Sequence, residues 1–494
     1  MNRQSFIIAA VVVLATGASA RAFVSGTANQ KWGAAEFGVG ATVTYSFGTG
    51  EQIVSESGTQ LQSVPISTIF PAGYELEVER GMIIWAAYGD LDFLRQQDGL
   101  YGDAVDIGIA AHPRPDGTNY LAHASLPPAG DLHFASNLNN GWSYIESDPG
   151  AHILTTAVHE FGHSLGLFHA GAEKQGVSIM QGGGLFDDGN HETIWQDDID
   201  AMHFIYGPAA GATWDPLFLN APGSWNDAAR WFTNAEPDAA TSVSVFNGNL
   251  AVTAPGEEAA SLRLGGMSAG LVRVLGAGEL QIAGATMIRH GGTLAMLGGA
   301  ASTGSLDLSA GGALAQRISD SPVATLAVTD TAIVAGGTLA LSPAGGFTPA
   351  SGEVFPVLTA GSVVGEFAAV EFAGLDPALA VNVDYLSNGV EAFIYLPGDF
   401  DADGVLGTSD WLALRGNLFT DVSSLGQAAA YAAGDFTFNG IVDHEDFMGF
   451  KSLYVAEFGA AAWAALAAIP EPSAMLLSVL AAAAVSSHVR RRSA

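Results

Sequence analysis

The chain has 494 residues, which exceeds the size of one ordinary domain, so about three domains are expected. It carries 50 Asp and Glu against 17 Lys and Arg, a formal net charge of −33, which argues against nucleic acid as a partner because nothing would offset phosphate repulsion. Cysteine is absent, which excludes disulfides, thiolate metal sites and thiol nucleophiles, and the 62 glycines favour β architecture over intrinsic disorder.

Residues 1–22 have the pattern of a secretory signal peptide. Arg3 supplies the positive charge, residues 6–14 form a short apolar run, and small-residue cleavage sites end at Ala20 and Ala22. The alternative is an N-terminal membrane anchor, but the apolar run is shorter than a spanning helix. We therefore expect an exported protein.

Residues 23–208 are predicted to form the first folded domain. Alternating apolar residues predict strands, and apolar residues at helical spacing predict helices. The expected strands are 41–47 and 105–109, and the expected helices are 74–85, a segment near 151–165, and 197–206. Acidic residues begin the last helix and Gly207 ends it. The mixture favours one α/β or α+β domain.

The segment from His159 to His169 has the spacing HExxHxxGxxH, which predicts a catalytic zinc site. His159 and His163 are four residues apart, so a helix places both imidazoles on one face. Gly166 can adopt positive φ, which ends the helix and turns the chain so that His169 becomes the third ligand. Three imidazoles leave one zinc position open, and Glu160 can act on a zinc-bound water as general base. The alternative, a buried helix with incidental histidines, leaves the fixed offsets of the glycine and third histidine unexplained.

This signature is that of the metzincin proteases, and the domain resembles their matrixin branch along most of its length. Residues 121–124, 130–134 and 195–207 resemble the family's edge strand, structural-metal segment and C-terminal helix. The resemblance implies a zinc endopeptidase whose edge strand holds an extended peptide substrate. It also implies that Met180 forms the methionine turn beneath the zinc.

The resemblance further implies a structural zinc bound by three histidines and an aspartate. His123 and His133 match this pattern, whereas His112 and Asp116 lie in a shortened loop. The alternative is a set of surface histidines in a loop closed by hydrogen bonds. Ala170 replaces the serine typical of matrixins, and latency by a cysteine switch is not expected.

Residues 210–395 are rich in small and apolar residues and carry few charges. A glycine followed by a short alternating strand recurs at 278–282, 292–296, 312–315 and 337–341. This recurrence predicts an all-β region, either a parallel β-helix-like solenoid or a sandwich. Its expected role is a spacer or a binding surface.

Residues 396–456 contain two acidic loops with oxygen-bearing side chains at the spacing of calcium-binding loops. The candidate calcium ligands are Asp399, Asp401, Asp403 and Asp410 in the first loop, and Asp435, Asn439, Asp443 and Asp446 in the second. Helix-like segments follow both loops, so the segment resembles the small α-helical dockerin type I modules. The resemblance implies a cohesin-like partner; the alternative is a calcium-stiffened stalk.

Residues 470–494 begin with Pro-Glu-Pro, continue with an apolar run at 474–485 and end near three arginines. They resemble the PEP-CTERM sorting signal of Gram-negative and related bacteria. The resemblance implies export and processing at the envelope membrane through a short transmembrane segment. The alternative is a simple tail anchor.

The sequence thus predicts a secreted or cell-surface bacterial endopeptidase that uses Zn²⁺ and Ca²⁺ and cleaves extracellular proteins. The alternative is a non-enzymatic β-rich adhesin or scaffold component, attached through the dockerin-like module. Glu160 and all three histidines are intact, which argues against this alternative because losing any one would abolish the chemistry.

Overall fold

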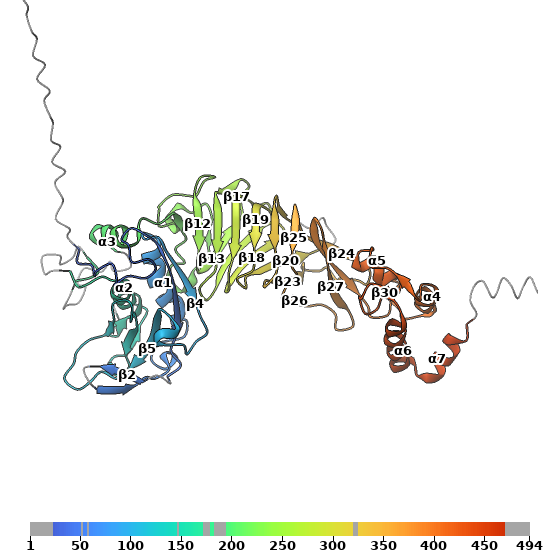
Figure 1. The fold of residues 1–494 in the computed structure, drawn as a ribbon, viewed down its shortest axis with the longest axis horizontal. Coiled ribbons are helices and arrows are strands. Elements are labelled where there is room, and N and C mark those ends of the chain that lie inside the picture. Colours follow the sequence, from blue (N-terminus) through green and yellow to red (C-terminus); the bar gives the residue numbers. More distant parts are fainter. Residues whose placement is uncertain are drawn as a thin grey trace, which may run out of the picture. The chain divides into compact units, whose positions relative to one another are not determined.

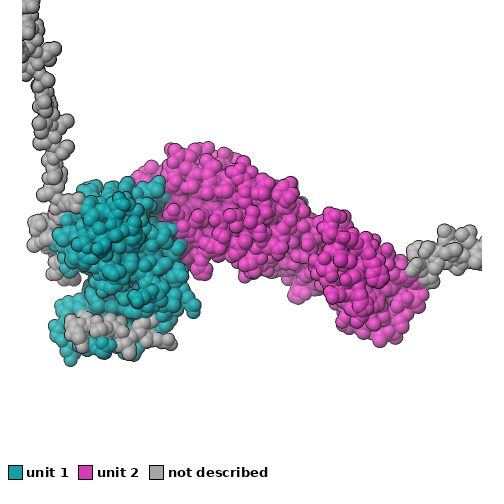
Figure 2. Space-filling view, in the orientation of Figure 1, with its two compact units in different colours: residues 1–219 teal, residues 220–494 magenta. Residues whose placement is uncertain are grey.

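The computed structural model describes residues 23–50, 53–56, 59–145, 148–170, 178–181, 194–319 and 325–469. The chain divides into two compact units, residues 1–219 and 220–494 (Figures 1 and 2). The predicted signal peptide and sorting tail lie outside the described residues. Among those that are described, no helix is long and apolar enough to cross a membrane.

The first unit contains a five-stranded sheet in the order β4-β1-β5-β7-β6, with only β6 antiparallel to its neighbour. Its strands are β1 (Ala41–Phe47), β4 (Leu91–Arg95), β5 (Ile107–His112), β6 (Ala122–Ala124) and β7 (Leu132–Ala135). The helices are α1 (Tyr74–Ala86), α2 (Ile153–Ser164) and α3 (Gln196–Tyr206). Smaller strands are β2 (Ile53–Glu56), β3 (Thr59–Gln62), β8 (Trp142–Ser143), β9 (Ala151–His152) and β10 (Gly211–Thr213). The predicted mixture of strands and helices is confirmed.

One predicted strand is displaced. The sequence placed it at 105–109, whereas β5 begins at Ile107 and continues to His112. The cause is tertiary pairing: β5 lies between β1 and β7, and its second half pairs with β7 up to His112. This extension carries His112 to the end of the strand.

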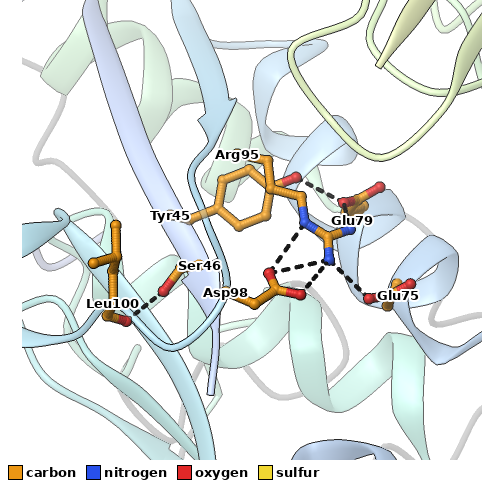
Figure 3. A network of polar contacts seen from close by, with 7 residues as sticks. All are labelled: Tyr45, Ser46, Glu75, Glu79, Arg95, Asp98 and Leu100. Atoms are coloured by element: carbon orange, nitrogen blue, oxygen red, sulfur yellow. Dashed lines mark hydrogen bonds and ion pairs between the residues drawn. The ribbon is translucent and has the colours of Figure 1, made fainter. Parts of the chain in front are cut away.

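An ion network around the buried Glu79 ties α1 to the sheet (Figure 3). Arg95 on β4 pairs with Glu75 at 2.8 Å, with Asp98 at 2.9 Å and with Glu79 at 3.6 Å. Tyr45 on β1 donates a hydrogen bond of 2.7 Å to the fully buried Glu79. Because the buried carboxylate and guanidinium satisfy one another, α1 is fixed on the sheet without an unpaired buried charge.

The second unit begins with a β-solenoid, in which the chain passes back and forth between two mainly parallel sheets (Figure 1). The first sheet contains β12 (Ser242–Val245), β14 (Glu257–Ala259), β15 (Ser261–Leu264), β17 (Glu279–Ile288), β19 (Ala300–Asp307), β21 (Leu326–Val328), β22 (Thr331–Ile333), β24 (Val354–Thr359), β25 (Ser362–Val364), β27 (Ala380–Leu386) and β28 (Gly389–Tyr395). The other contains β11 (Gly223–Ser224), β13 (Gly248–Val252), β16 (Gly270–Leu275), β18 (Gly292–Leu297), β20 (Ala313–Ile318), β23 (Thr338–Pro343) and β26 (Ala369–Phe372). Parallel pairing favours the solenoid alternative over the sandwich.

The recurring glycines fit the close stacking of the coils. A Cβ atom on Gly292 would collide with the backbone carbonyl of Leu264, and one on Gly312 with that of Ile288. Each carbonyl belongs to the preceding coil, so only glycine admits the approach. β27 and β28 pair antiparallel at the far end of the stack.

The helical segment after the solenoid contains α4 (Thr408–Gly416), α5 (Gln427–Ala432), α6 (His444–Phe458), α7 (Ala460–Ala467), β29 (Thr420–Asp421) and β30 (Ile441–Val442). Its aromatic core includes Phe393 and Tyr395 from β28, which pack against Tyr431. The Tyr431 hydroxyl also donates to the Leu396 carbonyl at 2.7 Å. The core therefore continues across residue 395, where the sequence had placed a domain boundary, and α7 extends it past 456.

Candidate metal centre and active site

Helix α2 carries two of the predicted zinc ligands, and it ends before the third, so that the chain can turn back toward the first two. His159 and His163 lie one turn apart on α2, which stops at Ser164. Gly166 then adopts φ +102°, and its N–H donates to the His163 carbonyl at 2.8 Å. This reversal brings His169 beside the other two histidines, as the glycine in the motif predicted.

The three imidazoles converge on one small volume. Their centroids lie 5.0 Å apart for His159 and His163, 5.3 Å for His159 and His169, and 4.6 Å for His163 and His169. One ring nitrogen of each lies within 4.8 Å of the others, and the Nε2 atoms of His159 and His169 are 3.3 Å apart. This spacing fits three nitrogens around one cation.

Backbone carbonyls select the ring nitrogen that faces this volume. His159 Nδ1 lies 2.7 Å from the Ile179 carbonyl, and His163 Nδ1 lies 2.6 Å from the Leu167 carbonyl. A carbonyl only accepts, so both Nδ1 atoms carry hydrogen and both Nε2 lone pairs are available to a metal. The sequence motif contains no sign of these two acceptors.

Burial keeps the histidines neutral, as metal ligands must be. It lowers the pKa of His159 to about 3 and that of His163 to about 4, and it also lowers the pKa of His169. Burial has the opposite effect on the adjacent carboxyl and raises the pKa of Glu160 to about 8. A nearby cation would favour the carboxylate and so restore the base.

The raised pKa of Glu160 gives a testable pH dependence for the metal-free protein. Because this carboxyl binds its proton more tightly when folded, its contribution to stability is lost as pH rises from about 4.5 to about 8. Glu160→Gln has no such titration. The wild type therefore loses stability that the variant keeps. With a metal chelator present, the free energy of unfolding of the variant relative to wild type should increase by up to about 4 kcal/mol between about pH 5 and pH 8. Urea denaturation at each pH measures the free energy of unfolding of both proteins. The same pH dependence in variant and wild type would contradict the raised pKa of Glu160.

Met180 packs against α2, the helix that carries His159 and His163. A Cβ atom on Gly162 of α2 would collide with the Met180 sulfur, so the methionine packs closely against the helix backbone. Asp198 in the first turn of α3 holds this segment, since it accepts from Ser178 Oγ at 2.6 Å and from the Ile179 N–H at 2.9 Å. The sequence reasoning linked this acidic turn only to the helix dipole and missed the contact.

The N-terminal segment also contacts the loop that delivers His169. Gly26 N–H donates to the Gly166 carbonyl, and Phe168 N–H donates to the Val24 carbonyl, both at 2.9 Å. The Trp32 indole donates to the Ser164 carbonyl at 2.8 Å. These long-range contacts were not predicted because no local pattern signals them.

A second histidine cluster forms where β5, β6 and β7 lie side by side. His112 ends β5, and His123 on β6 stands directly opposite His133 on β7. Their rings are 4.8 to 5.2 Å apart, and the Nε2 atoms of His112 and His123 are 3.1 Å apart. Asp116 is exposed and lies outside the group of three, so the predicted aspartate ligand is not assembled with the histidines.

The chemistry of this cluster fits a metal ion. His133 is 5% exposed and its Nδ1 has no hydrogen-bond partner. Burial, aided by the neighbouring histidines, lowers its pKa to about 2, so the ring is neutral. A buried lone pair without a partner is costly, and a cation shared among the three rings would satisfy it.

The two acidic loops have matching backbone arrangements. Asp399 in the first loop and Asp435 in the second each accept from the N–H groups four and five residues later. Asp410 and Asp446, eleven residues further on, each lie in the first turn of a helix and accept from the N–H of its N-cap residue. Carboxylate oxygens of Asp399, Asp401 and Asp403 lie within 4.8 Å of one another. Asn439 and Asp443 also bond backbone N–H groups within their loop.

Comparison with known proteins defines the class of the first unit. Residues 73–207 match the family model for the matrixins, Peptidase_M10, so this part of the chain is a matrixin domain. The match includes the zinc-motif helix and both histidine clusters, and it supports a zinc metalloendopeptidase.

The chain is similar to individual matrix metalloproteinases over the same region. It is 31% identical over 140 residues to Matrix metalloproteinase-C of Caenorhabditis elegans, covering 26% of this chain and 24% of that protein. It is 32% identical over 148 residues to human Neutrophil collagenase (27% and 29%) and 30% identical over 139 residues to Stromelysin-1 of Rattus norvegicus (26% and 28%). The aligned part is thus less than a third of each relative.

Proposed function

We propose that the protein is an exported, zinc-dependent endopeptidase that hydrolyses peptide bonds of extracellular proteins. The observation that carries the proposal is the convergence, within a matrixin domain, of His159 and His163 from helix α2 with His169 from the loop after it. Glu160 follows the first of these histidines on the same helix. The same family match disfavours the alternative of a non-enzymatic adhesin.

Each side chain has a defined role in the proposed reaction. The three histidines hold a zinc ion, which when bound polarises the scissile carbonyl and acidifies water. Glu160 takes a proton from the attacking water and returns it to the leaving amine. The Ile179 and Leu167 carbonyls keep the imidazoles oriented, and Met180 supports the helix from below.

The edge of the sheet provides the proposed substrate surface. β6 is the last strand of the five-stranded sheet, and Leu121 immediately before it is 41% exposed. An extended peptide can add to such an edge through backbone hydrogen bonds, with its side chains in alternate pockets. We also propose that His112, His123 and His133 hold a second, structural zinc ion. Because His123 lies on β6, that ion would stiffen the substrate strand.

The proposal is tested by digesting a defined mixture of peptides and an unfolded protein. We expect cleavage at internal bonds, identified by mass spectrometry, and loss of all cleavage in the presence of a zinc chelator. Removal of terminal residues alone would contradict the endopeptidase assignment.

We further propose that residues 396–456 form a dockerin-like module that binds calcium through the two acidic loops. The repeated positions of Asp399 and Asp435, and of Asp410 and Asp446, support this proposal. A cohesin-like partner remains a proposal from the resemblance, as does sorting to the cell envelope through residues 470–494.

Calcium should stabilise the second unit in the full chain. Its binding relieves repulsion among the loop carboxylates, and saturation at about 100 times the dissociation constant would contribute about 2.7 kcal/mol. Asp401→Ala with Asp403→Ala removes two exposed carboxylates and should reduce the calcium-dependent rise in melting temperature. Asp421→Ala, an exposed carboxylate outside the loops, is the matched control. Calorimetry without a calcium effect in wild type would contradict the proposed module.

A further inference from the structure

The second histidine cluster has a neighbour that the sequence analysis did not consider. Tyr101 lies between β4 and β5, and its hydroxyl contacts His133 Nε2. The planes of the two rings are nearly parallel, with an interplanar angle of 22° and centroids 5.8 Å apart. Both nitrogens of His133 therefore have distinct surroundings, because Nε2 meets a hydroxyl and Nδ1 has no hydrogen-bond partner.

Tyr101 is itself held by a second contact. Its side chain hydrogen-bonds Asp131, which also accepts from the Gly108 N–H at 3.0 Å. Gly108 has no side chain to obstruct this arrangement: a Cβ atom there would collide with the Tyr101 ring and approach the Asp131 carboxylate to 2.8 Å. Glycine at this position of β5 thus leaves room for the tyrosine and the carboxylate together.

We propose that Tyr101, anchored by Asp131, is a positioning residue that orients His133 so that Nδ1 faces a metal ion shared with His112 and His123. The inference rests on the second zinc site of the proposed function. It assigns the hydrogen of the imidazole to Nε2, which donates to the Tyr101 hydroxyl, while that hydroxyl donates to Asp131.

The hydrogen-bond inventory supports this direction. A carboxylate only accepts, so the tyrosine donates its single proton to Asp131 and keeps lone pairs for the His133 Nε2–H. The lone pair of His133 then resides on Nδ1, the buried atom that lacks a partner. A residue that hydrogen-bonds a metal ligand and fixes its tautomer and ring orientation typically contributes about 10- to 100-fold in metal affinity.

The test measures zinc binding by the full chain in a Glu160→Gln background, which prevents self-cleavage. Competition with a chromogenic chelator should resolve two zinc ions in the parent protein. Tyr101→Phe deletes only the hydroxyl and should weaken one of the two sites by about 10- to 100-fold. Asp131→Asn should weaken the same site. Tyr144→Phe, which loses a hydroxyl that donates to backbone carbonyls elsewhere in the unit, should leave both affinities unchanged.

A spectroscopic measurement separates orientation from general stability. Cobalt in place of zinc should show an altered d–d spectrum for the weakened site of Tyr101→Phe, while the melting temperature of the metal-free variant stays within a few degrees of the parent. Unchanged zinc affinities in Tyr101→Phe would overturn the inference. Equal weakening of both sites with a lower metal-free melting temperature would also overturn it, since the tyrosine would then act only in packing. A parent protein that binds a single zinc would remove the second site and this inference, yet leave the peptidase proposal intact.

Discussion

Glu160→Gln should lower the rate of peptide hydrolysis by about 10²- to 10⁴-fold, the contribution usual for a general base, without loss of zinc. The amide has nearly the shape of the carboxylate but cannot accept the proton of the attacking water. The three histidines remain untouched, so metal analysis should give the same zinc content for variant and wild type. A paired measurement of kcat/KM and zinc content checks both parts.

The outcome separates two explanations for any loss of activity. If Glu160→Gln lost zinc together with activity, the residue would be required for the site's structure, and its assignment as base would fail. Turnover near that of wild type would reject the proposed mechanism altogether.

His169→Ala is expected to weaken zinc binding at the catalytic site by more than about 10²-fold, because even outer partners of metal ligands contribute 10- to 100-fold. Peptide hydrolysis should fall to background, since without zinc the scissile carbonyl is not polarised and the water that Glu160 deprotonates is not acidified. Zinc titration and peptide turnover on the same preparation provide the measurement.

His203→Ala is the matched control. His203 is an exposed histidine on α3 and lies outside both three-histidine clusters of the described residues. It should keep the zinc affinity and rate of wild type. If His169→Ala kept full zinc occupancy and the wild-type rate, His169 would not be a ligand. The zinc would then be held by the two histidines of α2.

The sequence predicted the parts of the catalytic site whose spacing is local. His159 and His163 are four positions apart on one helix face, and the glycine that ends the helix is part of the same motif. The carbonyls of Ile179 and Leu167 could not be predicted in this way. They are main-chain groups, and any residue type supplies the same acceptor.

Contacts between distant segments were likewise inaccessible from the sequence. The pairing of Val24 and Gly26 with residues 166–168 depends on tertiary folding, and backbone pairing leaves no side-chain signature. Tyr101 meets His133 only because β5 and β7 are neighbours in the sheet. Asp116 is a different case, because family resemblance suggested it as a ligand, whereas the structure leaves it exposed and outside the group of three histidines.

The β region shows how far a repeated pattern can be interpreted. Glycine followed by alternating apolar residues predicted the strands, and β18, β20 and β23 begin at or next to the expected glycines. The same pattern suits a solenoid and a sandwich, because alternation records which face is buried and not which strand pairs with which. Parallel registers between successive coils distinguish the two.

The most direct test of the central claim is zinc-dependent peptide cleavage by the wild-type chain. An internally quenched peptide is incubated with protein before zinc removal, after removal, and after zinc is restored, with Glu160→Gln at equal zinc content as the control. The proposed site predicts hydrolysis that disappears with the metal, returns with it, and is absent from the variant. Hydrolysis that persists without zinc, or no hydrolysis by the fully loaded wild type, would contradict the account.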